Sequence, residues 1–411
     1  MNYRISHSSK KVEGDIQLPT SKSISNRALI IQALCSKPFQ IHHLAKAKDT
    51  QTLQEVLQSD DTTINVGDAG TAMRFLTAFL STKDDSFVIG GSERMRERPI
   101  EPLVTALNQL GANIIYLEKE GYPPIQSKGK ITQGGSLKID AGMSSQYLTA
   151  LLLIAPTLTK GLTLHLEGTV VSKPYIKMTL QMMDYFGVKS HWIKNDITIP
   201  EQAYEAKDLT IEADWSAAAF WFELIALSNM GSVFIEGLQK KSWQGDQEAL
   251  ALFTSLGVEH SFTENGLKLQ KGNCSKQHFI FNLLDTPDLA QAICCTLAGL
   301  NKSAQLSGLQ TLSIKETDRL HALQKELGKL GLHTKIDKQS IQLESGHLQS
   351  PIQSLATHND HRMAMCLAPL ALATEEIIIE DIEVVNKSYP TFWKDLKKVG
   401  FKITLVTDSS S

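Results

Sequence analysis

Basic residues gather where apolar helical stretches are predicted to begin. Lys22, Arg74 and Arg362 each stand within the first few residues of such a stretch. The first N–H groups of a helix lack intrahelical partners and the helix dipole adds positive potential, so a cation there is favourable only when an anion offsets the repulsion. The pattern therefore predicts a site for a small anion with several negative charges. The residues that form this pattern are Lys22, Arg27, Arg74, Arg98, Lys315, Arg319, Arg362 and Lys387.

Two carboxylates, Asp288 and Glu316, are the candidates for proton transfer. Neighbouring cations stabilise an ionised carboxylate and lower its pKa. Such a group still acts as a base when it is positioned on a reacting hydroxyl. His361 has two interpretations, a structural histidine or a supporting catalyst, and the sequence alone leaves both open.

Length and composition exclude several classes of protein. A chain of 411 residues exceeds a single hydrophobic core, so two domains are expected. With 41 Lys and Arg against 44 Asp and Glu, the net charge of −3 gives no general case for binding nucleic acid or a membrane surface. The amino terminus lacks the apolar core of a signal peptide, and the five cysteines include no C-x-x-C pair. We expect a cytoplasmic protein without a metal site.

A repeat organises the chain. Five glycines follow amphipathic stretches, such as the one from Glu316 to Leu330, and each is predicted to be a left-handed helix end. These glycines are Gly111, Gly187, Gly257, Gly331 and Gly400. Apolar, buried helices are predicted in phase with them, beginning near Ser23, Gly70, Gln146, Trp215, Asp288 and His361. The spacing indicates six α/β units of about 72 residues, of which the first is shorter by roughly 25.

Several strings match one known family in its order. They are Ser21-Lys22-Ser23-Ile24-Ser25-Asn26-Arg27-Ala28, Ala69-Gly70-Thr71-Ala72-Met73-Arg74, Glu97-Arg98-Pro99-Ile100, Ser144-Ser145-Gln146, Lys315-Glu316-Thr317-Asp318-Arg319-Leu320 and Asn359-Asp360-His361-Arg362-Met363-Ala364. On these residues the chain resembles the 5-enolpyruvylshikimate-3-phosphate synthases, the 3-phosphoshikimate 1-carboxyvinyltransferase family. The resemblance runs from Lys22 to Lys387.

The resemblance implies an α/β fold of two domains, each built from three βαβαββ repeats, with the first repeat shortened. The N-terminal domain would span residues 20–212, and the C-terminal domain residues 1–19 and 213–411. The active site would lie in the interdomain cleft, and the protein would be a monomer.

The resemblance also implies a reaction. Members of the family transfer the enolpyruvyl group of phosphoenolpyruvate to the 5-hydroxyl of shikimate 3-phosphate and release phosphate. The reaction passes through a tetrahedral intermediate without metal or organic cofactor, and it serves the shikimate pathway to chorismate and the aromatic amino acids. The herbicide glyphosate occupies the phosphoenolpyruvate position in this family.

Site residues carry over by motif. Those implied for shikimate 3-phosphate are Lys22, Ser23, Arg27, Ser144, Ser145, Gln146, Ser172, Tyr175, Asp288, Thr311 and Lys315. Those implied for phosphoenolpyruvate are Lys22, Gly70, Arg98, Gln146, Arg319, Arg362 and Lys387. Asp288 would accept the proton of the 5-hydroxyl, Glu316 and Lys22 would exchange protons with the methylene carbon, and His361 would support them.

Two positions depart from the family pattern, and two alternatives stay open. Asp68 stands where asparagine is usual before Ala-Gly-Thr, and we interpret it as a helix N-cap. Thr311 stands where an asparagine often contacts the shikimate phosphate. The first alternative is the related enolpyruvyl transferase that acts on UDP-N-acetylglucosamine, although the loop before Arg98-Pro99 has no cysteine. The second is a non-catalytic relative inactivated by the short first repeat.

Overall fold

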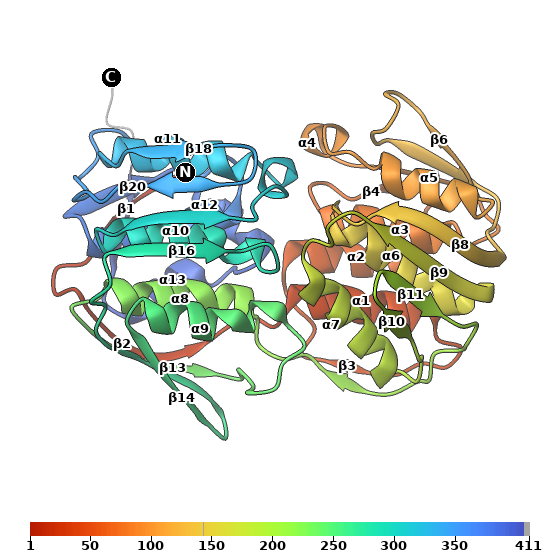
Figure 1. Cartoon of the computed structure of the whole chain (residues 1–411), viewed down its shortest axis with the longest axis horizontal. Coiled ribbons are helices and arrows are strands. Elements are labelled where there is room, and N and C mark those ends of the chain that lie inside the picture. The colour runs from red at the N-terminus through yellow and green to blue at the C-terminus, as the bar shows by residue number, and fades with distance from the viewer. Residues whose placement is uncertain (143, 407–411) are drawn as a thin grey trace. The chain divides into compact units, whose positions relative to one another are not determined.

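The computed structural model describes residues 1–142 and 144–406, which form two compact units. The N-terminal unit is Thr20–Ile211, and the C-terminal unit combines Met1–Pro19 with Glu212–Ser411. Figure 1 draws the first in red to yellow-green and the second mainly in green to blue. Of the C-terminal range expected from the sequence, residues 407–411 lie outside the described part of the chain.

One order of elements recurs through both units: a strand, a helix, a parallel strand, a second helix and an antiparallel hairpin. In the N-terminal unit it runs through β4 (Thr63–Asn65), α3 (Gly70–Leu80), β5 (Phe87–Gly90), α5 (Glu101–Gln109), β6 (Asn113–Tyr116) and β7 (Ile125–Lys128). It recurs in β8 (Gln133–Asp140), α6 (Ser145–Ile154), β9 (Thr159–Glu167), α7 (Lys173–Tyr185), β10 (His191–Ile193) and β11 (Asp196–Ile199).

The C-terminal unit contains the same order twice in full. The first copy is β2 (Lys11–Gln17), α8 (Trp215–Leu227), β13 (Met230–Glu236), α9 (Ala249–Ser255), β14 (Val258–Thr263) and β15 (Gly266–Lys271). The second is β16 (His278–Asn282), α10 (Ala290–Gly299), β17 (Ser303–Ser307), α11 (Arg319–Lys329), β18 (Thr334–Ile336) and β19 (Ile341–Leu343). In every full copy the first two strands pair in parallel and the hairpin pairs antiparallel.

A further copy in the C-terminal unit borrows a strand from the start of the chain. Its elements are α12 (His361–Leu367), β20 (Glu376–Ile379), α13 (Phe392–Lys398) and β21 (Lys402–Val406). Strand β1 (Asn2–Ser6) lies between β20 and β21 and pairs antiparallel with both. Segments nearly 400 residues apart in sequence therefore complete one sheet.

The first repeat is reduced. It consists of α1 (Lys22–Leu34), β3 (Ile41–His42) and α2 (Lys48–Gln58), with β3 paired in parallel to β12 (Leu209–Thr210). In the described chain α2 is followed directly by β4 of the next repeat, and the sheet of β3 and β12 has no hairpin.

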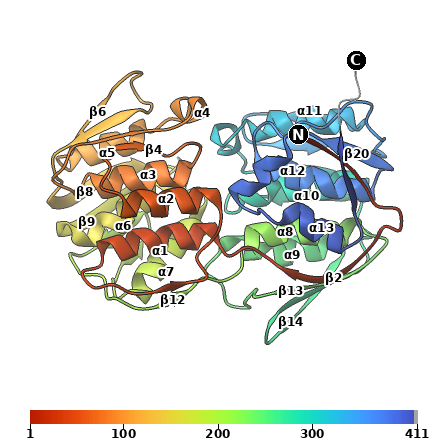
Figure 2. The ribbon, with the colours of Figure 1, turned by 180° about the vertical axis from the view of Figure 1, so that it is seen from behind.

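Apolar helices form the interior of each unit. In α8 every residue except Ser216 is buried, because the helix is apolar on all faces and packs against α10 and α12. Figure 2 shows these three helices stacked within the C-terminal unit. Helices α1, α3 and α6 pack on one another in the same way in the N-terminal unit. The predicted buried helices are confirmed, since all six begin within three residues of the expected positions.

The glycine helix ends are also confirmed. Gly111, Gly187, Gly257, Gly331 and Gly400 all have positive φ, between 84° and 101°. At Gly111 the chain closes with hydrogen bonds from Gly111 N to the Asn108 carbonyl and from Ala112 N to the Leu107 carbonyl. This backbone conformation suits glycine because it lacks a Cβ atom.

Two further sequence expectations concern the chain as a whole. None of the helices in the described residues has the length and apolar composition needed to cross a bilayer. All five cysteines are free thiols, of which Cys35 and Cys274 are only partly buried.

Candidate active site

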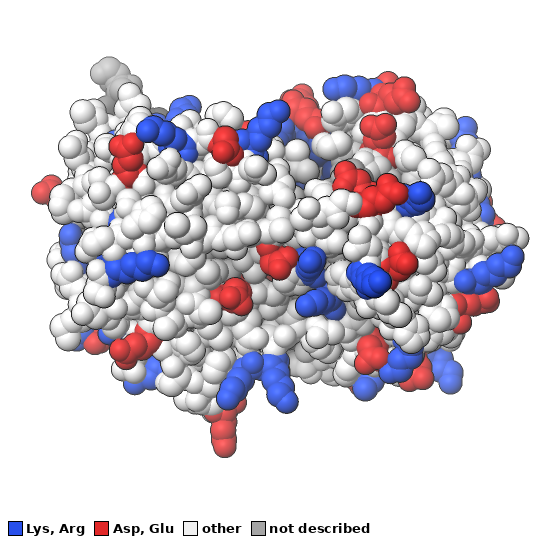
Figure 3. All heavy atoms as spheres, in the orientation of Figure 1, with Lys and Arg blue, Asp and Glu red and all other residues white. Residues whose placement is uncertain are grey.

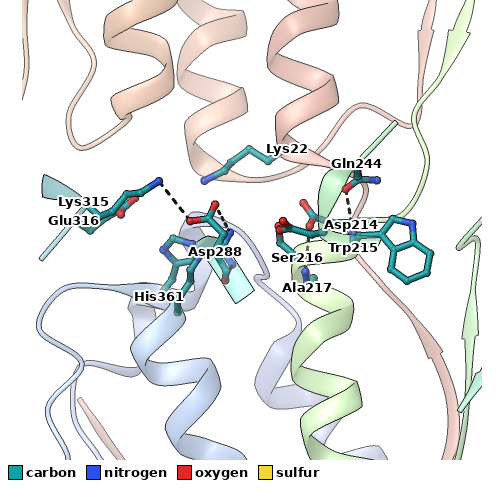
Figure 4. A network of polar contacts seen from close by, with 12 residues as sticks. Lys22, Asp214, Trp215, Ser216, Ala217, Gln244, Asp288, Lys315, Glu316 and His361 are labelled. Atoms are coloured by element: carbon teal, nitrogen blue, oxygen red, sulfur yellow. Dashed lines mark hydrogen bonds and ion pairs between the residues drawn. The ribbon is translucent and has the colours of Figure 1, made fainter. Parts of the chain in front are cut away.

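Asp288 lies at the centre of a cluster of cations in the C-terminal unit. It belongs to a short 3-10 turn, Pro287–Leu289, that leads into α10. Its Oδ1 lies 3.1 Å from Arg319 Nη1 and 3.5 Å from Lys315 Nζ, and its Oδ2 lies 3.1 Å from Arg362 Nη2. Arg362 Nη1 also donates to the Asp288 carbonyl at 3.0 Å. Figure 4 shows Lys315 directed toward this carboxylate.

Glu316 links Arg319 to one more of the predicted cations, Lys387. Its Oε2 accepts from Arg319 Nη2 at 3.0 Å, and its Oε1 lies 3.3 Å from Lys387 Nζ. Lys387 ends the 3-10 turn Ile382–Lys387. The structure therefore brings together six residues that the sequence marks as candidates, although as many as 99 positions separate them along the chain.

Asp360 anchors this cluster to the start of α12. Its carboxylate accepts the backbone N–H of Arg362 at 2.8 Å as the N-cap of the helix, and it also accepts Arg319 Nε at 2.7 Å. His361 is the first residue of α12 and is 2% exposed. A buried, capped helix start thus fixes the Arg362 backbone beside Asp288.

The electrostatics of the cluster keep Asp288 ionised. Burial alone would raise the pKa of Asp288, but Arg362, Lys315 and Arg319 together hold it well below its ordinary value. Burial likewise opposes the charge of Arg319, yet Asp360, Glu316 and Asp288 raise the pKa of Arg319 above its usual range. Three cations around one ionised carboxylate can hold an anionic ligand and can orient Asp288 on a hydroxyl of that ligand.

Asp246 is a buried acid beside the cluster that sequence reasoning missed. Burial and the charge of Asp288 raise the pKa of Asp246, Arg362 opposes them, and the result is a pKa of about 6. The Ser216 hydroxyl donates to its carboxylate. Nearby, Gln244 accepts the backbone N–H of Trp215 (Figure 4). The sequence Trp243-Gln244-Gly245-Asp246 carries no cation at a helix start, so the pattern that found the other residues gave no signal here.

In the N-terminal unit, Lys22 is paired with an acid. It is the first residue of α1, and its Nζ lies 3.1 Å from Oδ2 of Asp49 on α2. The Asp49 side chain is 7% exposed. Asp49 is therefore a second residue that the sequence did not mark, and it fixes the position of the Lys22 ammonium.

Gly70 and Arg98 are in close contact. A Cβ atom at Gly70 would lie 2.5 Å from Arg98 Nη1, so only glycine leaves room for the guanidinium. Arg98 is 6% exposed, and its Nε has no hydrogen-bond partner among the described residues. A buried guanidinium with an unused donor is suited to binding an anion. Gln146 Nε2, on α6, donates to Thr71 of α3 at 3.3 Å.

Arg27 is held within the protein. Its Nε donates to Thr179 at 2.8 Å, and Nη1 donates to the Ser23 carbonyl at 2.8 Å. Nη2 donates to Thr149 and to the Tyr175 carbonyl. Burial lowers the pKa of Arg27 to about 10. These contacts join Ser23 and Tyr175 to Arg27 and give it a role in packing α1, α6 and α7.

The remaining predicted residues lie at helix starts. Ser144 caps α6 by accepting the Gln146 N–H, and Ser145 is the first residue of that helix. Ser172 precedes α7 in the left-handed region with φ of 54° and makes no cap hydrogen bond. Thr311 is buried, and its hydroxyl has no partner among the residues described.

The expected cap role of Asp68 is wrong. Helix α3 begins at Gly70, and its N-cap residue is Ala69, which makes no side-chain cap hydrogen bond. The Asp68 carboxylate instead accepts a hydrogen bond from the hydroxyl of Ser92. Asp68 lies one residue before the N-cap position, in the turn between β4 and α3.

Charge on the surface is mixed. On the face drawn in Figure 3, Lys and Arg side chains alternate with Asp and Glu. The ionic residues around Asp288 form instead a compact, largely buried group in which the cations Arg319 and Arg362 and the anion Asp360 are each at most 9% exposed.

Comparison with known proteins identifies the family. The family model of EPSP synthase (3-phosphoshikimate 1-carboxyvinyltransferase) matches residues 6–59 and 54–396. The chain belongs to the EPSP synthase family. The two matched segments meet at the end of α2, where the first repeat is short.

Two curated relatives are 3-phosphoshikimate 1-carboxyvinyltransferases. The protein of Bacteroides fragilis strain YCH46 is 43% identical over 408 residues, which cover 98% of this chain and 99% of the relative. Because 408 aligned positions make up nearly all of that relative, it is about as short as this chain. The protein of Mannheimia haemolytica is 34% identical over 426 residues, covering 95% of this chain and 98% of the relative.

Solved structures support the fold. The EPSP synthase of Acinetobacter baumannii superposes with a TM-score of 0.79 at 19% identity, covering 98% of this chain and all of that chain. The predicted α/β class is therefore confirmed, and membership of the EPSP synthase family disfavours the alternative enolpyruvyl transferase that acts on UDP-N-acetylglucosamine.

Proposed function

We propose that this protein transfers the enolpyruvyl group of phosphoenolpyruvate to the 5-hydroxyl of shikimate 3-phosphate, with release of inorganic phosphate. The observation that carries the proposal is the group of Lys315, Arg319, Arg362 and Lys387 around Asp288 and Glu316, in a chain of the EPSP synthase family. Both substrates bring a phosphate and a carboxylate, and Arg and Lys are the usual partners of such groups.

The residue roles follow from chemistry and position. Asp288 accepts the proton of the 5-hydroxyl while the oxygen of that hydroxyl forms a bond to C2 of phosphoenolpyruvate. A proton is delivered to the methylene carbon, with Glu316 and Lys22 as donors and His361 in support. The same groups, Glu316 and Lys22, then take a proton back from that carbon. The bond between C2 and the phosphate oxygen breaks, which releases phosphate and restores the carbon–carbon double bond. Because the pKa of Asp288 is held well below its ordinary value, the proton that it receives must pass on quickly.

Residues of both units contribute to the proposed site. For shikimate 3-phosphate they are Lys22, Ser23, Arg27, Ser144, Ser145, Gln146, Ser172, Tyr175, Asp288, Thr311 and Lys315. For phosphoenolpyruvate they are Lys22, Gly70, Arg98, Gln146, Arg319, Arg362 and Lys387. The reaction needs no metal or organic cofactor, so treatment with a chelator is expected to leave activity unchanged. We also expect the protein to be a monomer and to be cytoplasmic.

A phosphate-release assay tests the function. Phosphate is expected only when both substrates are present, and shikimate 3-phosphate alone, phosphoenolpyruvate alone or phosphoenolpyruvate with UDP-N-acetylglucosamine should release none. Mass spectrometry should detect the enol ether product in equal amount to phosphate. No release from the folded protein would support the non-catalytic alternative, and release with UDP-N-acetylglucosamine would contradict the acceptor.

A further inference from the structure

The segment that leads into α12 has an unusual backbone. His358 and Asn359 are consecutive non-glycine residues in the left-handed region, with φ of 52° and 56°. Such conformations are costly and persist only where the surrounding structure holds them. Asp360 and Arg362 of the candidate active site follow immediately, so whatever holds these two residues also sets the direction of the Arg362 side chain.

Glu326 holds this segment from α11. Its side chain is 0% exposed. One oxygen, Oε2, accepts the backbone N–H of Ala356 at 2.9 Å, and the other, Oε1, lies 2.8 Å from Nε2 of His358. Lys329 Nζ lies 2.7 Å from Oε2 and also donates to the Ser354 carbonyl at 2.8 Å. Both oxygens of the buried Glu326 carboxylate thus contact the segment, and one of them also contacts Lys329, which binds the segment at Ser354.

The opposite end of the same helix holds the other end of the segment. Arg319, the first residue of α11, donates to Asp360 at 2.7 Å. Asp360 N donates to the Thr357 carbonyl at 2.9 Å, and the Asp360 carboxylate caps Arg362 N at 2.8 Å. Helix α11 therefore fixes both the beginning and the end of the left-handed turn.

We propose that Glu326, acting through His358 and the Ala356 N–H, is a positioning residue for Arg362. It keeps the 356–359 turn in its left-handed form, so that the Arg362 guanidinium meets Asp288 in the geometry that receives an anion. The inference rests on the proposed function, in which Arg362 binds phosphoenolpyruvate. Glu326 itself contacts no substrate.

The variant Glu326→Gln tests this role. The amide preserves size but has only one acceptor oxygen, so it cannot accept both from the Ala356 N–H and from His358 Nε2. The KM for phosphoenolpyruvate is expected to rise about tenfold, while kcat falls by less than about threefold, because a small misplacement of a binding group affects binding before chemistry. An unchanged KM for phosphoenolpyruvate in an active, folded variant would overturn the proposal.

A matched pair of glycine variants separates the contact from backbone strain. Both His358→Gly and Asn359→Gly relieve the backbone strain of a left-handed position, but only the first removes the contact with Glu326. The Asn359 side chain is exposed. The KM for phosphoenolpyruvate is expected to rise severalfold in His358→Gly and to stay within about twofold in Asn359→Gly. Equal effects of the two substitutions would contradict the proposal.

Hydrogen exchange gives a readout that does not depend on activity. The amides of residues 356–362 should exchange faster in Glu326→Gln and His358→Gly than in the unaltered protein, and at the original rate in Asn359→Gly. An inactive unaltered protein would contradict the proposed function, whereas unchanged exchange in both test variants would contradict the positioning role alone.

Discussion

Asp288 combines two properties that seldom occur together, because its side chain is largely withdrawn from solvent and yet is held ionised by three cations. The substitution Asp288→Asn keeps the shape but removes the proton acceptor. We expect kcat to fall by about a hundredfold or more. Binding of shikimate 3-phosphate, measured by calorimetry, should be retained because a neutral amide leaves the cations more attractive to anions. Near-normal turnover would remove Asp288 from proton transfer.

Gly70 has its own consequence at the scale of one atom. A methyl group in Gly70→Ala would displace the Arg98 guanidinium, which lies 2.5 Å from the new atom's position. The KM for phosphoenolpyruvate is expected to rise by about tenfold, since Arg98 must move out of a buried place. Inhibition by glyphosate should weaken more than the KM rises.

The KM for phosphoenolpyruvate and the inhibition constant for glyphosate together test the prediction for Gly70. Steady-state assays of the original protein and Gly70→Ala give the KM for phosphoenolpyruvate and the inhibition constant for glyphosate. Gly328→Ala is the control, because its added atom would meet nothing within 4 Å. Equal inhibition of Gly70→Ala and the original protein would show that Gly70 does not set the fit of the inhibitor.

Asp246 predicts a pH dependence of stability. Its pKa rises to about 6 in the folded protein, so the folded state prefers the protonated acid. The contribution of Asp246 to the free energy of unfolding is fully present below about pH 3.9, the ordinary pKa of Asp in an unfolded chain. It is lost as the pH rises through about 6. Asp246→Asn should therefore raise the Tm at pH 8 relative to the original protein, and the gain should shrink toward pH 5. An equal gain at both pH values would contradict the assignment.

At the scale of the element, α11 offers two glycines with opposite roles. Gly328 lies inside the helix with open space beside it, whereas Gly331 ends it with φ of 84°. Alanine favours a helix interior by about 1 kcal/mol over glycine. Gly328→Ala should increase the free energy of unfolding by about that amount, and Gly331→Ala should decrease it by about 1 kcal/mol. Urea unfolding of both variants measures the difference, and a shift of the same sign in both would contradict the helix-end role.

The elements also show which features a sequence reveals. Helix starts and glycine ends are recorded in adjacent residues, through caps, periodicity and the absence of a Cβ, so they could be predicted locally. The contacts of Asp246 and Glu326 could not, because they join segments about 30 or more positions apart whose proximity depends on sheet order. The cap prediction for Asp68 is wrong because the local sequence does not show which of two adjacent residues takes the N-cap position, and the contact with Ser92 joins segments 24 positions apart.

At the scale of the whole molecule, the predicted phosphoenolpyruvate ligands are divided between the units. Lys22, Gly70 and Arg98 belong to the N-terminal unit, whereas Arg362 and Lys387 belong to the C-terminal unit. A ligand that is bound by residues of both sets links the two units. Small-angle scattering should show a smaller radius of gyration with shikimate 3-phosphate and glyphosate than without ligand. An unchanged radius at saturation of both ligands would contradict this prediction.

The strand that the chain contributes to a distant sheet has a consequence for biosynthesis. Strand β1 leaves the ribosome long before its partners β20 and β21, which are made only after residue 375. The N-terminal unit is one continuous segment and can fold during translation. In the C-terminal unit, β2 must wait for β13, and β1 must wait longer, until β20 and β21 are made. Nascent chains in which Ile211 has emerged from the ribosome should thus carry a folded N-terminal unit next to an unpaired, strand-forming segment, Met1–Pro19, on which chaperones would act.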